Sequence, residues 1–131
     1  MKYLFGLVGL IGLMMMPNQM QGQSIFEQWP ALDEFHGVMS QTFHPAEEGN
    51  LEPIKTRSSE MITKAKALAK STVPAAFASP AITMATKKLV KGSKSLDKLV
   101  KKGNDEAITA SLVGLHDVFH EIVGLCRGDD H

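Results

Sequence analysis

The chain has 131 residues, with 14 basic side chains balanced by 14 acidic ones, five histidines, eight methionines and one cysteine. This length fits a single small domain and is too short for a Rossmann-type oxidoreductase or a TIM barrel. A lone cysteine excludes an intramolecular disulfide framework and a four-cysteine zinc or iron–sulfur site. Because the chain has no Cys-x-x-Cys-His motif, covalent c-type haem is excluded as well.

Residues 1–22 have the pattern of a secretory signal peptide. Lys2 is followed by 14 residues without a charge, residues 3–16, and a proline ends this run. A membrane-spanning helix needs about 20 apolar residues, so the run better fits the apolar region of a signal peptide. We therefore predict cleavage after Gly22 and export of residues 23–131 to the periplasm or the medium, as a protein that is not integral to the membrane. An uncleaved membrane anchor is the alternative.

Four amphipathic helices account for the rest of the chain. Apolar residues recur at helical spacing between breaks rich in proline and glycine, the first of which begins at Pro45. The predicted helices cover about residues 25–44, 53–72, 80–102 and 105–126. Pro53 and Pro80 suit the first turn of a helix, and Asn104 is a candidate N-cap. Four helices of similar length with short links predict an all-α fold, an antiparallel up-down-up-down four-helix bundle.

Each predicted helix carries one apolar stripe, which we expect to face the core. The stripe residues are Trp29, Leu32, Phe35, Met39, Phe43, Ile54, Met61, Ala65, Leu68, Ile82, Leu89, Leu96, Val100, Ile108, Leu112, Leu115, Phe119, Val123 and Cys126. Met84 also falls at core spacing. We expect Met39, Met61 and Met84 to pack in the core, with thioether ligation of copper or haem as the alternative. Cys126 either fills the end of the bundle or pairs with another chain.

Charge is unevenly distributed along the exported chain. Residues 23–54 carry six acidic side chains and no Lys or Arg, residues 55–102 carry twelve basic and two acidic side chains, and residues 103–131 carry six acidic side chains and one arginine. The second and third helices should therefore form a basic face suited to an acidic protein or an anionic envelope surface. Simple solvation of the helix faces is the alternative. The lysine-rich face of these two helices lacks interleaved aromatic residues, which argues against nucleic acid as a partner.

Three histidines lie beside the apolar stripes of the first and last helices. At about 100° per residue, His36 lies ~40° from the Leu32 direction, His116 lies ~40° from Leu112, and His120 lies another ~40° further round. If residue 44 is level with residue 105, Asp33 is level with His116 at ~1.5 Å per residue. The seam between the two helices is therefore predicted to bring His36, His116, His120 and Asp33 together.

This set of side chains has the chemistry of a metal site. Two histidines at i and i+4 present two nitrogens to one ion, and a facing histidine and carboxylate supply the remaining donors, a set that suits zinc or copper(II). His44 with Glu48 is a candidate for an outer or second site, ~12 Å along the helix from His36. The alternative to a metal site is a buried polar layer of hydrogen-bonded side chains. Its members would be His36, Ser58, Ser93 and His116.

The sequence shows no Gly-rich phosphate loop, nucleophile elbow or catalytic dyad, so we do not expect an enzyme. An exported chain of this size, with Phe-His-Gly-Val-Met at residues 35–39 and Leu-His-Asp-Val-Phe-His at residues 115–120, resembles in its architecture the small periplasmic four-helix bundles, which include cytochrome b562-like proteins and several metal-resistance proteins. For the b-type cytochromes the resemblance implies haem held by a Met of the first helix and a His of the last, here Met39 and His116 or His120. Three functions stay open: metal binding, electron transfer by haem b, and a structural or interaction role.

Overall fold

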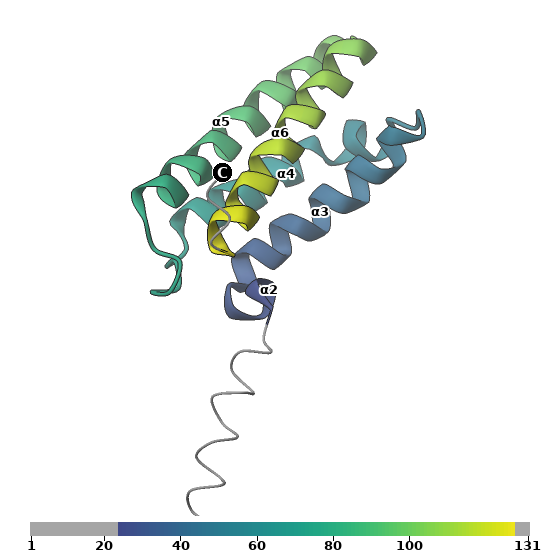
Figure 1. Ribbon diagram of the computed structural model, residues 1–131. Helices are drawn as coiled ribbons and strands as arrows, with labels where there is room; N and C mark the ends of the chain where they lie inside the picture. Colours follow the sequence, from purple (N-terminus) through teal and green to yellow (C-terminus); the bar gives the residue numbers. More distant parts are fainter. Residues whose placement is uncertain (1–23, 128–131) are drawn as a thin grey trace, which may run out of the picture.

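The computed structural model describes residues 24–127, and all regular secondary structure in this range is helical (Figure 1). The helices are α2 (Ile25–Gln28), α3 (Pro30–Glu47), α4 (Glu52–Lys70), α5 (Pro80–Lys102) and α6 (Asp105–Cys126). The predicted all-α class is confirmed. The predicted signal peptide, residues 1–22, lies outside the described residues.

The prediction of one continuous helix over residues 25–44 is wrong in two respects. The structure divides it at Trp29, whose backbone (φ −132°, ψ 82°) is not helical, because the proline that follows at position 30 disfavours the α conformation in the residue before it. The longer piece, α3, then continues through Pro45 to Glu47. A proline this close to the end of a helix removes only one backbone hydrogen bond, so the helix does not stop there.

The three later helices end within two residues of their predicted bounds. Ser79 caps α5 by accepting a hydrogen bond from the backbone N–H of Ile82, and Asn104 caps α6 in the same way through Ala107, as predicted. Gly103 closes α5 at φ 78°, a left-handed conformation that a residue with a Cβ adopts at a cost. Gly103 and Asn104 together fix the tight turn between α5 and α6.

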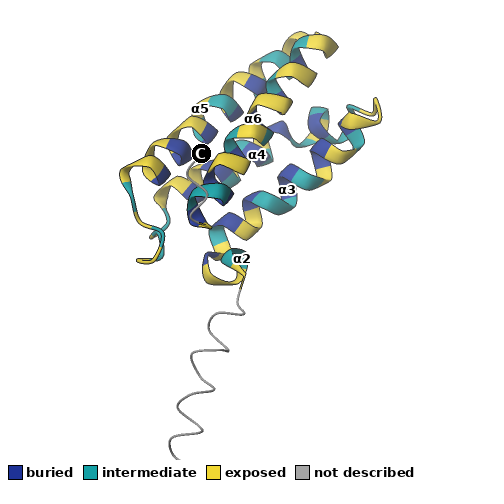
Figure 2. Cartoon of the chain, in the orientation of Figure 1, coloured by how far each residue is buried: buried dark blue, intermediate teal, exposed yellow. Residues whose placement is uncertain are grey.

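Consecutive long helices run in opposite directions, and each packs on the next (Figure 1). The helix α6 also packs against α3, but this seam is less extensive than the contacts of α3 with α4, α4 with α5 and α5 with α6. The buried side chains face inward between the helices (Figure 2). All predicted stripe residues except Val100, which is half-buried, are in this core. Met84, by contrast, is 62 % exposed, so its predicted core position is wrong.

The start of α3 is tied to the end of α4 by a hydrogen bond. The indole N–H of Trp29 donates to Ser71 Oγ at 2.9 Å, and Ser71 Oγ in turn donates to the Leu68 carbonyl at 2.6 Å. Trp29 is itself buried, at 2 % exposure. These contacts place α2 beside the beginning of the loop that joins α4 to α5.

The helix α6 also has the length and hydropathy of a membrane-spanning segment. Its most apolar 18-residue window has a mean hydropathy of 1.2, and 33 % of that window is buried within the protein. Core helices of soluble proteins meet the same criterion. At the end of α6 the thiol of Cys126 is buried in the core, and this burial raises the pKa of the thiol.

The polar layer considered as an alternative to a metal site does not form. Ser58 Oγ donates instead to Asp97 Oδ1 at 2.6 Å, and this bond, with one from Lys101, holds the pKa of Asp97 below its ordinary value. Ser93 is fully buried, and among the described residues its Oγ has no hydrogen-bond partner. The two histidines assigned to this layer lie against aromatic rings, as shown below.

The two buried serines are expected to respond in opposite directions to substitution by alanine. Ser93→Ala should raise the free energy of unfolding by about 1–2 kcal/mol, because it removes an unpaired buried hydroxyl and places a better helix former on α5. Ser58→Ala should lower it by about 1–3 kcal/mol, because Asp97 loses a charge-assisted hydrogen bond. Urea denaturation of both variants measures the two changes. Destabilisation by Ser93→Ala would contradict the assignment of an unpaired hydroxyl.

Candidate metal centre

A cavity of about 200 Å³ lies between α3 and α6, and four of the five histidines of the chain line it. The lining residues are His36, Met39, Ser40, Phe43, His44, His116, Phe119 and His120. The cavity forms along the seam where the two helices pack least extensively. It contains three of the four residues predicted as the metal site, together with the histidine predicted for a second site.

His116 and His120 lie one helical turn apart on α6 with their Nε2 atoms 3.2 Å apart. Their rings are nearly perpendicular, at 77°. With metal–nitrogen bonds of about 2.0–2.1 Å, two ligands of one ion lie ~2.9 Å apart in square-planar geometry and ~3.4 Å apart in tetrahedral geometry. The observed separation lies between these values, so the two nitrogens are spaced as a chelating pair.

Stacking against aromatic rings orients two of the four imidazoles. The ring of His116 lies parallel to that of Phe43, with centroids 3.8 Å apart. The ring of His36 is stacked on Phe26 at 4.7 Å and on Phe119 at 5.3 Å. Because stacked rings resist rotation out of the common plane, these contacts hold both imidazoles at the edge of the cavity.

His44 joins the same cavity from the last turn of α3. Its side chain is 70 % exposed, and its Nδ1 lies 3.5 Å from Glu47 Oε1, so the carboxylate beside it is that of Glu47 and not the predicted Glu48. A carboxylate at Nδ1 leaves Nε2 as the donor for a metal, an arrangement common in histidine metal sites.

Asp33 is exposed on α3 and does not line the cavity. The predicted register, with residue 44 level with residue 105, is the cause of this difference. His36 lies opposite Phe119 and not near residue 113, a shift of six residues or ~9 Å along the helix. The shift moves Asp33 out of the site and brings His44 into it.

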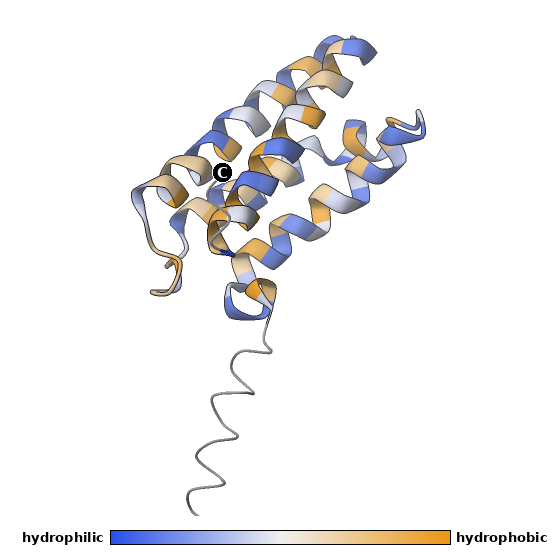
Figure 3. Ribbon diagram, in the orientation of Figure 1, coloured by the Kyte–Doolittle hydropathy of each residue, from blue (hydrophilic) through white to orange (hydrophobic). Residues whose placement is uncertain are grey.

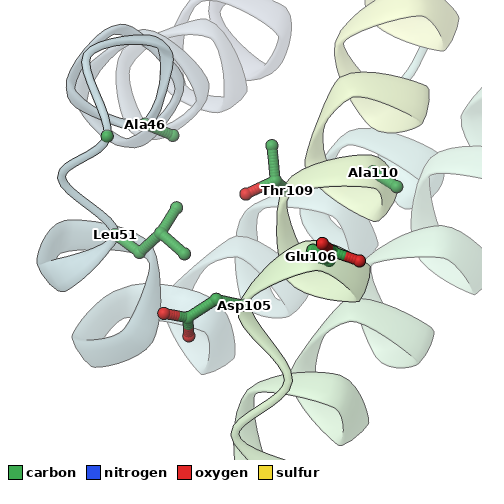
Figure 4. Close-up of a pocket in the computed structure, with 7 residues that line it drawn as sticks. Ala46, Leu51, Asp105, Glu106, Thr109 and Ala110 are labelled. Carbon is green, nitrogen blue, oxygen red and sulfur yellow. The ribbon is translucent and has the colours of Figure 1, made fainter.

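A second hollow lies further along the same seam, near the start of α6. Ala46 and Leu51 face Thr109 across it, with Asp105 and Glu106 at its rim (Figure 4). It contains no histidine, and Asp105 is paired with Lys55 at 2.9 Å. The nitrogen donors of the seam are therefore confined to the histidine cavity.

Within residues 24–127, no group of three or more His, Cys, Asp and Glu side chains is positioned to hold a metal ion as it stands. The preformed element is the His116–His120 pair. A third donor would have to come by side-chain rotation, and the His44 imidazole, with its side chain 70 % exposed, is free to rotate.

The pKa of His116 is lowered from its ordinary value of 6.5 by burial of the ring and by the neighbouring His120, and to a smaller extent by His44. Asp117 and Glu47 oppose this shift. The imidazole is therefore held in its neutral form, which is the form that binds metals.

This shift predicts a pH dependence of stability. In the pH range below about 6.5 and above the lowered pKa, the unfolded chain binds a proton at His116 that the folded chain does not, so the free energy of unfolding should fall as the pH falls. Urea denaturation at several pH values in a metal-free buffer measures the slope. His116→Gln should reduce the slope, whereas His131→Gln, in the C-terminal tail, should not. Equal slopes in the wild type and His116→Gln would contradict this prediction.

Comparison of the chain with family models, with curated proteins and with solved structures finds no match.

Proposed function

We propose that this protein is an exported four-helix-bundle protein that binds one divalent transition metal ion, zinc or copper, in the histidine cavity between α3 and α6. In this proposal residues 1–22 are a cleaved signal peptide, and α3, α4, α5 and α6 form the antiparallel up-down-up-down bundle. Supporting the bundle, each long helix packs on its neighbour in sequence and α6 returns to α3. The proposed role is metal binding and not catalysis.

The observation that carries the metal proposal is the 3.2 Å separation of the His116 and His120 Nε2 atoms on one wall of a cavity that contains two further imidazoles. His116 and His120 act as the chelating pair, His44 supplies the third nitrogen, and His36 lies within the same lining. Imidazole donors suit zinc and copper(II). Because the donors come from the first and last long helices, the bound ion links α3 to α6 where their packing is weakest.

The second candidate function is haem b binding, and one observation favours it. Met39, the thioether that the resemblance to b-type cytochromes implies, lines the same cavity as His116 and His120. The volume of about 200 Å³ favours the ion, because cofactor pockets usually measure ~300–1,000 Å³. A structural or interaction role without a ligand is the third candidate.

Isothermal titration calorimetry of the chain from Gln23 with zinc and copper(II) chlorides tests the proposal. All described helices and the buried core lie within residues 24–127, so this chain carries the complete fold. We expect one ion per chain at pH 7.5. Protein purified from its native compartment should show stoichiometric metal and no Soret band. A Soret band would establish haem instead, and the absence of both haem and metal binding would leave the structural role.

The predicted export is tested by mass spectrometry of the native protein. We expect a mature chain that begins at Gln23 and is recovered from the periplasm or the medium. A chain that retains residues 1–22 in the membrane fraction would contradict cleavage and favour the uncleaved anchor.

A further inference from the structure

Five lysines without acidic partners line a groove between the second half of α4 and the first half of α5. The groove has a volume of about 480 Å³, with Val90 among its lining residues. The lysines are Lys66, Lys70, Lys87, Lys91 and Lys94. Within the described part of the chain none of the five forms an ion pair, whereas other lysines of these helices do, as Lys64 does with Glu34 at 2.6 Å. Their charge is therefore free to meet an external anion.

The loop that joins α4 to α5 lies beside this groove and carries no charge. Residues 71–86, from the end of α4 through the second turn of α5, include no acidic or basic side chain. Ala75, Ala76 and Ala78 of this loop are exposed, and Met84 is the most exposed large apolar residue of the described chain, at 62 %. The loop lies at the lower left end of the molecule in Figure 3, where its two strongly apolar residues, Val73 and Phe77, are half-buried against the core and the alanines remain exposed.

Lysines flank this uncharged segment on both sides. Lys70 immediately precedes it and Lys87 immediately follows it. An exposed apolar tip with cations around its base matches the two attractions of an anionic bilayer: apolar side chains enter the headgroup region and basic side chains meet the negative surface potential. An acidic protein would account for the lysines but not for the uncharged, exposed tip.

The first described helix, α2, also lies at this end of the molecule (Figure 1). The hydrogen bond from Trp29 to Ser71 places the start of α3 at the first residue of the uncharged segment.

We propose that the α4–α5 loop and the five lysines beside it dock this protein on an anionic lipid bilayer, with the loop tip in the headgroup region. This surface is separate from the histidine cavity, which lies between the other two long helices. Binding measurements in the presence of a chelator therefore test it independently of the metal proposal.

The test is co-sedimentation of the chain from Gln23 with vesicles of phosphatidylcholine alone and of phosphatidylcholine mixed with phosphatidylglycerol. We expect binding to the mixed vesicles only, and release by 1 M salt, where the screening length is about 3 Å. The triple variant K66Q/K70Q/K87Q should bind on the order of 100-fold more weakly. The matched control K98Q/K101Q/K102Q removes the same charge at the far end of α5, and its affinity for the mixed vesicles should fall less than about tenfold.

A fluorescent label tests the orientation. In a Cys126→Ser background, an environment-sensitive dye on Ala76→Cys should shift its emission to the blue with anionic vesicles, and the same dye on Ala110→Cys, at the opposite end of the molecule, should not. Equal losses of vesicle binding in the two triple lysine variants would overturn the proposal. So would the absence of a blue shift from the dye at position 76. Equal binding to soluble polyglutamate, unaffected by Ala76→Asp, would overturn it in favour of an acidic protein partner.

Discussion

Substituting His116 by alanine is expected to weaken zinc binding by more than about 100-fold, beyond the 10–100-fold loss that follows removal of a residue that only orients a ligand. The reason is that the substitution leaves His120 without the nitrogen that lies 3.2 Å away and so removes the chelate. His120→Ala should have the same effect. Isothermal titration calorimetry at pH 7.5 measures the loss, and circular dichroism verifies that both variants remain helical.

Substitutions at Asp33 and His44 distinguish the predicted register of α3 against α6 from the observed one. Asp33→Ala should leave zinc affinity unchanged, because Asp33 is exposed and outside the cavity, whereas His44→Ala should weaken binding. If Asp33→Ala weakens binding and His44→Ala does not, the register of α3 against α6 is that predicted from the sequence and the site is a different one.

His116→Ala and His120→Ala should also lose the stabilisation that the ion provides. At a free metal concentration 100-fold above the dissociation constant, binding to the folded chain alone adds ~2.7 kcal/mol to the free energy of unfolding. In the wild type this gain should appear as a rise in melting temperature that disappears as the pH falls below ~6.5, because protons compete for the imidazole nitrogens. A metal-induced rise of equal size in a His116→Ala/His120→Ala variant would contradict the assignment.

Phe119→Ala is expected to lower the free energy of unfolding by about 3–5 kcal/mol. Phe119 is 4 % exposed, and its ring lies 5.9 Å from Phe35 and 5.3 Å from His36. Truncation therefore enlarges the cavity between α3 and α6 that the Phe119 ring already lines.

Val113→Ala is the matched control for Phe119→Ala, because Val113 lies on the same helix and is 42 % exposed. Its effect should stay within about 0.5 kcal/mol. Guanidinium denaturation of the two variants measures both values. A loss below about 1 kcal/mol in Phe119→Ala would show that the α3–α6 seam contributes little to the fold.

Most of the fold follows from patterns that are local in the sequence. Caps such as Asn104 and prolines such as Pro80 mark helix ends through their own backbone chemistry, so the bounds of α5 and α6 were predicted correctly. The break at Trp29 and the continuation through Pro45 were missed, because a proline that ends one helix, begins another or lies within a last turn looks the same in the sequence. Met84 was placed in the core wrongly because it lies about 200° around α5 from the buried Ile82, on the face of the helix turned away from the bundle.

The residue types of the candidate metal site were predictable from the sequence, but the register of α3 against α6 was not. Angular positions around a helix follow from the sequence and placed the histidines at one seam, whereas the offset between two helices distant in sequence depends on packing that no local pattern records. One pattern in the sequence could have placed His44 beside the other cavity histidines. Phe precedes His at residues 35–36, 43–44 and 119–120, and in each case the phenyl ring is buried while the imidazole lines the cavity. This repeated pair groups His44 with His36 and His120.

The buried thiol of Cys126 allows local opening at the end of α6 to be measured as the rate of a chemical reaction. Because Cys126 is buried, at 8 % exposure, and burial raises the pKa of its thiol, a disulfide reagent is expected to react chiefly when the last turns of α6 separate from the core. The ratio of the labelling rate in the folded chain to that of an unstructured thiol gives the free energy of this local opening. Since Cys126 is the only cysteine of the chain, the reaction reports on one position without any substitution.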